Sequence, residues 1–148
     1  MPEKETLRRA QADKREGKAP STQAGEFVRE EIEHIREGKH GARSAKQAIA
    51  IGLSKARRAG VDLPPPEKGE ASTETRRQAK RDVRKGKSAS KGKKSTKRSR
   101  ASLNKLKREG HSAASKAALS RQARSAAAKR SAKSRSRSAK KAAATRKK

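Results

Sequence analysis

The sequence predicts an all-α protein: a short helical hairpin, several conditional helices and a largely disordered C-terminal tail rich in Lys, Arg, Ala and Ser. Three observations support this prediction. Hydrophobic residues make up 28% of the 148 residues, whereas globular chains contain about 45–50%. Glycines recur every 21 to 26 residues, and the formal net charge is +29. Low hydrophobicity with high charge is typical of chains whose burial cannot offset the entropy of ordering.

Five glycines each follow a proline-free stretch rich in helix-forming residues, and they are Gly17, Gly38, Gly60, Gly86 and Gly110. Each has Arg or Lys one or two residues before it, an arrangement typical of helix C-termini. The segment REGK occurs at 15–18 and again at 36–39. A phosphate-binding loop needs a preceding strand and a second spaced glycine. We therefore interpret the repeat as the ends of helices.

Residues 1–19 are expected to form a polar N-terminal helix or arm, and residues 20–63 a helical hairpin. The first helix of the hairpin begins at Pro20 and ends near Gly38. Its apolar stripe, with helical spacing, consists of Ala24, Val28, Ile32 and Ile35, with Phe27 at its edge.

The second helix of the hairpin is predicted over residues 45–59. Ser44 opens the sequence SAKQ, a capping box in which Gln47 is the partner. The apolar stripe then includes Ile49, Leu53 and Ala56. A six-residue connection favours antiparallel neighbours. The resulting core is thin, so we expect marginal stability, self-association or a protein partner through residues 21–60, and Ile51 lies off the stripe where a partner would bind.

A proline-containing linker is expected at 64–72, basic conditional helices at 73–110, and a low-complexity basic tail at 111–148. Residues 75–148 carry 29 of the 44 Lys and Arg but only two acids, Asp82 and Glu109. Close like charges oppose helix formation in water. The tail is therefore expected to order only on a polyanion.

Several classes of function find no support. The chain has no cysteine, and its longest apolar run, residues 48–53, is too short to cross a bilayer. The segment GKS at 86–88 lacks the first glycine of a phosphate loop, since Arg81 stands there. His34 and His40 lie near several glutamates, but the pattern favours a solvated acidic helix face over a metal site. We expect no enzyme activity, cofactor, metal, membrane contact or small-molecule substrate, and a soluble protein of the cytoplasm.

Polyanion binding is the function that the charge distribution predicts. Phosphate contacts supply affinity with little sequence information. Single-strand binders use aromatic stacking platforms, and Phe27 is the only aromatic residue, so duplex DNA is favoured, with RNA as the alternative. The expected nucleic-acid-binding residues are Lys46, Lys55, Arg57, Arg58, Arg76, Arg77, Lys80, Arg81, Arg84, Lys85, Lys93, Lys94, Lys97, Arg98, Arg100, Lys105, Lys107, Arg108, Lys116, Arg121, Arg124, Lys129 and Arg130.

The stretch from Pro20 to Pro66, above all KQAIAIGLSKARRAG at 46–60, resembles a domain of unknown function in small basic bacterial proteins, some labelled plasmid-stabilisation proteins. The tail is similar in composition to linker-histone-like tails, although residues 67–148 contain no proline. The resemblance implies a bacterial cytoplasmic or nucleoid-associated protein and brings no catalytic residues. The rival interpretation is a protein-interaction module of a plasmid-maintenance or stress system, or an RNA- or ribosome-associated protein.

Overall fold

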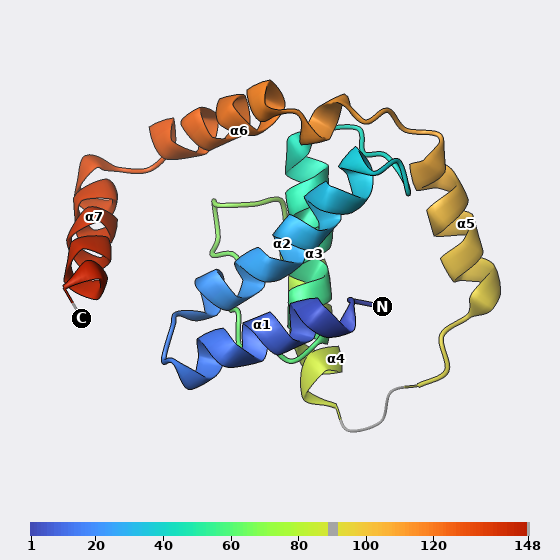
Figure 1. Ribbon diagram of the computed structural model, residues 1–148, viewed down its shortest axis with the longest axis horizontal. Helices are drawn as coiled ribbons and strands as arrows, with labels where there is room; N and C mark the ends of the chain where they lie inside the picture. Colours follow the sequence, from blue (N-terminus) through green and yellow to red (C-terminus); the bar gives the residue numbers. More distant parts are fainter. Residues whose placement is uncertain (89–91, 148) are drawn as a thin grey trace.

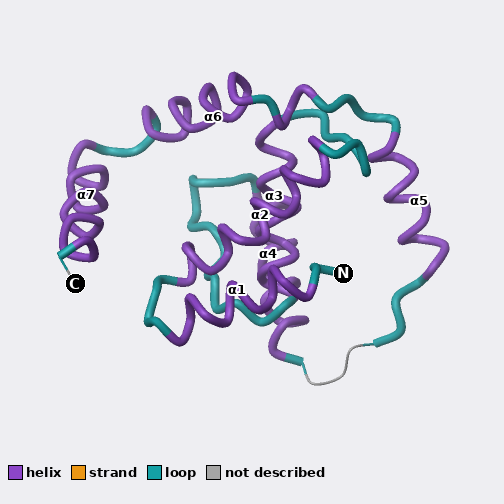
Figure 2. Tube along the Cα trace, viewed as in Figure 1, coloured by secondary structure: helices purple, strands orange, loops and turns teal. Residues whose placement is uncertain are grey.

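The computed structural model describes residues 1–88 and 92–147, which fold into helices joined by non-helical connections (Figures 1 and 2). The helices are α1 (Lys4–Arg15), α2 (Pro20–Arg36), α3 (Ala45–Arg58), α4 (Thr73–Lys87), α5 (Thr96–Lys107), the 3-10 helix η1 (Ser112–Ala114), α6 (Lys116–Ala128) and α7 (Ala132–Arg146). None of these helices is long and apolar enough to span a membrane.

The α2–α3 hairpin forms where the sequence predicts it. The Ser44 hydroxyl caps α3 by accepting a hydrogen bond from the Gln47 amide at 3.2 Å. The Gln47 side chain accepts in return from the Arg43 amide at 2.7 Å, one residue earlier than in the usual capping box. Gly38 and Gly60 end the two helices with φ of 75° and 93°, a conformation that suits glycine at helix C-termini.

The core is larger than two helices provide. Phe27, expected at the edge of its stripe, is fully buried in a cluster with Ala10, Ala24 and Ala56. Ala10 belongs to α1, so the N-terminal segment is a packed helix. Leu7, also on α1, packs against the same cluster. α1 therefore covers one end of the predicted hairpin.

A second cluster closes the other end of the hairpin. Ile35 of α2 packs with Ala42, Ala48, Ala113 and Ala114, and all five side chains are buried. The last two form η1, which lies in the segment expected to be a tail. Small side chains let these backbones approach closely, and burial of five methyl-bearing residues fixes the start of this segment to the core.

α2 and α3 approach each other most closely where Gly52 faces Val28. A Cβ placed on Gly52 would lie 2.6 Å from the Val28 Cα, a backbone atom. The residue is therefore glycine because the partner backbone occupies the space of a side chain.

α4 packs against α3 rather than forming only in the presence of a ligand. Ala79 and Asp82 of α4 are buried. Gly86 was expected to follow the end of this helix, but it lies within the last turn of α4, and its Cα faces the Arg57 carbonyl. The helix ends at Lys87, one residue beyond the predicted glycine. Close packing against α3 explains why this position is glycine, since a side chain would meet the Arg57 carbonyl.

The prediction of a disordered C-terminal tail is wrong. Residues 112–146 are almost entirely helical, in η1, α6 and α7. Each of the two longer helices begins with a serine cap: the Ser115 hydroxyl accepts from the Ala118 amide and the Ser131 hydroxyl from the Ser134 amide, both at 3.1 Å. Alanine, Lys and Arg have high helix propensity, and this combined preference outweighs the repulsion between neighbouring cations. Lys148 lies outside the described residues.

α5, α6 and α7 run around the outside of the α1–α4 bundle, as Figure 1 shows. No residue of these three helices is buried. α5 is nevertheless tied to the hairpin through the backbone, since the Gly41 and Ala42 amides donate to the Leu106 and Gly110 carbonyls at 2.9 and 3.0 Å. Residues 89–91, within the basic segment expected at 73–110, lie outside the described residues.

Candidate nucleic-acid interface

The bases of α3, expected on a nucleic acid, mostly make contacts within the chain. Lys46 is exposed. The Lys55 ammonium lies 2.6 Å from the Glu31 carboxylate, and the Arg58 guanidinium 2.7 Å from that of Asp82. Arg57 is buried and donates to the Leu63 and Pro64 carbonyls. Burial lowers the pKa of Arg57 from its ordinary value, because the charged guanidinium loses contact with water. These three bases therefore hold the fold together.

The predicted bases of residues 76–130 are positioned very differently. Arg76 is half-buried and donates to the Pro66 carbonyl. The others are exposed on α4, α5, α6 and their connections, and they are Arg77, Lys80, Arg81, Arg84, Lys85, Lys93, Lys94, Lys97, Arg98, Arg100, Lys105, Lys107, Arg108, Lys116, Arg121, Arg124, Lys129 and Arg130. They form a long cationic surface around the bundle.

The two acids of this half do not neutralise that surface. The Asp82 carboxylate is 1% exposed and pairs with Arg58 of α3. Glu109 lies 3.8 Å from Arg43, which belongs to the α2–α3 connection. Both acids are thus paired with bases from the first 74 residues. Neither of these two acids therefore pairs with a base of residues 75–148.

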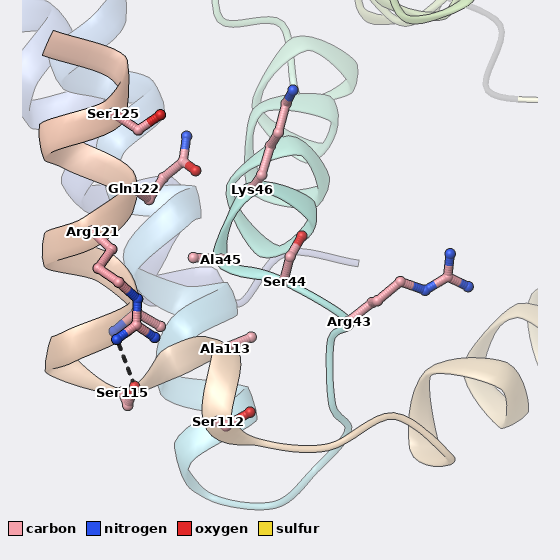
Figure 3. Close-up of a pocket in the computed structure, with 11 residues that line it drawn as sticks. Arg43, Ser44, Ala45, Lys46, Ser112, Ala113, Ser115, Arg121, Gln122 and Ser125 are labelled. Carbon is pink, nitrogen blue, oxygen red and sulfur yellow. Dashed lines mark hydrogen bonds between the residues drawn. The ribbon is translucent and has the colours of Figure 1, made fainter. Parts of the chain in front are cut away.

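A hollow of about 440 Å³ opens between the start of α3, η1 and α6 (Figure 3). Ser44 and Ser115, the caps of α3 and α6, both line it, so two helix N-termini meet there. Arg43, Lys46 and Arg121 supply three bases, and none of the described residues that line the hollow is acidic. Amide groups at helix N-termini together with bases favour anions such as phosphate.

The orientation of the lining residues is visible in Figure 3. Gln122 and Ser125 project from α6 toward the side where α3 lies, and Arg121 lies beside Ser115 at the start of α6. Lys46 extends along α3, and Arg43 extends away from α6. The hollow thus has polar groups on both walls and cations near its rim.

Sequence reasoning missed part of this surface. Arg43 was not among the expected residues, although it directly precedes the capping Ser44. On α7, Lys133, Arg137 and Lys140 surround a shallow depression on one face of the helix. Their spacing of four and three residues places them on one face of a helix. The prediction of a disordered tail did not use this pattern.

A cluster of acids and histidines lies apart from the cationic surface. Glu30 and Glu31 are 2% and 1% exposed, so the expected solvated acidic face is wrong for these two residues. The carboxylate of Glu31 lies 3.0 Å from His40 Nε2. Glu3 accepts from His34 at 2.9 Å and from Lys39 at 3.4 Å, and these hydrogen bonds lower the pKa of Glu3 below its usual 4.5.

Residues 14–68 match the model of a family of unknown function (DUF6496). The matched range covers α2 and α3 and ends in the connection before α4. It confirms a domain of unknown function where the resemblance was noted. The comparison with curated proteins finds no match, and neither does the comparison with solved structures.

Proposed function

We propose that the protein binds nucleic acid, with duplex DNA preferred, by neutralising phosphates without regard to sequence. One observation carries the proposal: the bases on α4 to α6 other than Arg76 are exposed, while Asp82 and Glu109, the two acids of residues 75–148, are paired with bases of the first half. Such a surface is the electrostatic footprint of a phosphate-binding protein. A nucleoid or plasmid association follows as the cellular setting of this activity.

The arrangement supports duplex backbone contact over single-strand binding. Base stacking needs an exposed aromatic platform, and Phe27, the one aromatic residue, is 0% exposed. Lys and Arg on helices that surround the bundle contact phosphates, which carry no base identity. The hollow between α3 and α6 would hold one phosphate and orient the strand along α6.

The rival function, a protein-interaction module, stays a prediction, but the structure changes the observations that motivated it. It rested on a thin two-helix core with an unpartnered Ile51. In the structure α1 and η1 complete that core, and Ile51 is half-buried. RNA remains an alternative ligand that the binding experiment separates from DNA.

The test is fluorescence anisotropy of the full chain with labelled duplexes of about 30 base pairs in two unrelated sequences, and with duplex RNA and single strands. We expect equal affinity for the two DNA sequences. Affinity should fall by about 10³–10⁵ between roughly 50 and 200 mM salt if six to ten phosphates are contacted. Tighter binding of duplex RNA would move the proposal to RNA.

A charge-matched pair of variants locates the surface. Substitution of Lys133, Arg137 and Lys140 by Gln removes three cations from α7, which buries no residue. Substitution of Lys4, Arg8 and Arg15 by Gln removes three exposed cations from α1. We expect the α7 variant to lower the slope of log K against log salt by about 3 units. Equal losses in the two variants would refute a localised cationic surface.

A truncation to residues 1–74 is a poor test. It removes α4, which packs on α3, and Ala113 and Ala114, which complete the core. Lost binding would then report unfolding, so substitutions in the full chain are preferable.

A further inference from the structure

Three side chains that suit a metal ion come together at one end of the α2–α3 hairpin. Glu31 and His34 lie on α2, and His40 lies on the connection to α3. Each offers one ligand atom, and these atoms lie within 4.8 Å of one another. We propose that Glu31, His34 and His40, assisted by Glu3, bind a divalent first-row transition-metal ion, with Zn²⁺ as the first candidate.

The hydrogen bonding of His40 supports the assignment. Its Nδ1 lies 3.1 Å from the Gly41 carbonyl oxygen, which can only accept, so Nδ1 carries a proton. In the neutral ring Nε2 then has a lone pair, and it faces the Glu31 carboxylate at 3.0 Å. A divalent ion placed between these two atoms would interact favourably with both. A backbone carbonyl on the other ring nitrogen is also the usual device that orients a metal-binding histidine.

The spacing of the ligand atoms fits a small ion. Zn–N and Zn–O bonds of about 2.0–2.2 Å at tetrahedral angles place neighbouring ligand atoms about 3.4 Å apart. The Glu31–His40 separation is 3.0 Å, and His34 Nε2 lies 2.9 Å from a Glu3 oxygen. Both pairs would open by a few tenths of an ångström to admit the ion, and the ion would displace the Nε2 proton through which His34 donates to Glu3.

Lys55 does not occupy the position of the ion. Its ammonium lies 2.6 Å from Glu31 Oε2, whereas the oxygen toward His40 is Oε1. Glu31 can therefore bind the ion through one oxygen and pair with Lys55 through the other. Lys55 also lies 3.5 Å from Glu30, which is buried beside Glu31, so its ammonium is shared between two carboxylates.

The ligand set indicates the class of ion and its role. Imidazoles with carboxylates suit Zn²⁺, Co²⁺, Ni²⁺ or Cu²⁺ rather than Mg²⁺ or Ca²⁺. Glu31 and His40 are 1% and 7% exposed, which fits a structural ion. It would fasten the N-terminal arm and the α2–α3 connection to α2.

The experiment is calorimetric titration of the untagged, chelator-treated full chain with ZnCl₂, together with visible spectroscopy of the Co²⁺ complex, whose bands report the ligand field directly. We expect one site per chain and a Tm that rises with Zn²⁺ concentration. His34→Gln and His40→Gln should each weaken binding by about 100-fold or more, since even loss of an orienting partner costs 10–100-fold.

His111→Gln is the matched control, because His111 is exposed and outside the cluster; its affinity should stay within about twofold of wild type. Circular dichroism of the metal-free variants shows whether they fold. If His40→Gln does not fold, His34→Gln and Glu3→Gln carry the test, since the Glu3 side chain is 53% exposed. Absent saturable binding, or binding equal in His34→Gln and His111→Gln, would overturn the proposal and leave a doubly protonated His40 as the partner of Glu31.

Discussion

The Arg58 guanidinium of α3 and the Asp82 carboxylate of α4 lie 2.7 Å apart, and Asp82 is 1% exposed whereas the Arg58 side chain is 47% exposed. Asp82 also accepts from Ser54 at 2.7 Å and from Gln78 at 3.0 Å. One buried carboxylate thus collects three donors and joins the two helices. A buried acid is tolerated only when its oxygens are satisfied in this way.

Asp82→Ala should lower the free energy of unfolding by about 2–4 kcal/mol, because three hydrogen bonds to a buried carboxylate that joins α3 and α4 are lost. Urea denaturation followed by circular dichroism measures this. Asp62→Ala is the control: Asp62 is 83% exposed and 3.7 Å from Lys87, so a change within about 0.5 kcal/mol is expected. Similar losses in both variants would show that the Asp82 network does not hold α4.

Gly52→Ala should destabilise the hairpin by about 1–3 kcal/mol, because the new methyl group meets the Val28 backbone. Gly25→Ala, on α2, has no atom within 4 Å of the added carbon. It should stabilise the protein by about 0.5–1 kcal/mol through the helix preference of alanine. Thermal denaturation of the two variants checks the prediction, and a stable Gly52→Ala protein would mean that α2 and α3 are further apart.

Ser115→Ala should destabilise the start of α6 by about 1 kcal/mol, since the hydroxyl caps the helix. Hydrogen exchange by mass spectrometry should show faster exchange over residues 116–119. Ser120→Ala, within α6, should leave protection unchanged or raise it, because alanine is the better helix former. Exchange of α6 amides at random-coil rates in the wild type would contradict the helical C-terminal region.

Lys18 gives a pH-dependent prediction at the α1–α2 turn. Hydrogen bonds to Asp13 and Glu16 raise the pKa of Lys18 above its ordinary 10.5. Its contribution to stability is therefore complete below pH 10.5 and is lost as pH rises through the folded-state pKa. The difference in Tm between wild type and Lys18→Gln should stay constant up to mildly alkaline pH and shrink above it. A Tm difference that stays constant through that pH range would contradict this role of Lys18.

The hollow predicts unequal roles for two arginines of α6. Arg121 lines it and Arg124 does not. Arg121→Gln should weaken DNA binding by about tenfold, the order of one charge-assisted hydrogen bond, and Arg124→Gln by less. Anisotropy titration at one low salt concentration compares them. Equal losses would assign both residues to the diffuse charge and remove the hollow from the interface.

The hairpin was predictable because its signals are local. The Ser44–Gln47 cap and the helix-ending Gly38 and Gly60 lie within the segment that they shape, and the stripes of α2 and α3 have helical spacing. The burial of Phe27 was not predictable, because it depends on contacts with Ala10 and Leu7 of α1. The α1 sequence has too few apolar residues to indicate a packed face.

The C-terminal helices escaped prediction for a different reason. Composition averages over a segment, whereas Ser115 and Ser131 act at single positions and alanine favours helix at every position. The burial of Ala113 and Ala114 depends on Ile35, about 78 residues earlier, and no pattern in the tail reveals it. In the sequence, Asp82 likewise looks like an isolated acid in a basic segment, because its partner Arg58 becomes its neighbour only when α3 and α4 pack together.

The burial of η1 also determines how a force applied to α6 reaches the rest of the protein. Ala113 and Ala114 stand directly before α6 and pack with Ile35, Ala42 and Ala48. A bound polymer that exerts force on α6 therefore also loads the hydrophobic contacts with α2 and α3, because no flexible linker separates α6 from η1. The helices after η1 are therefore attached to the hydrophobic core, and they cannot separate from it unless the contacts of Ala113 and Ala114 break.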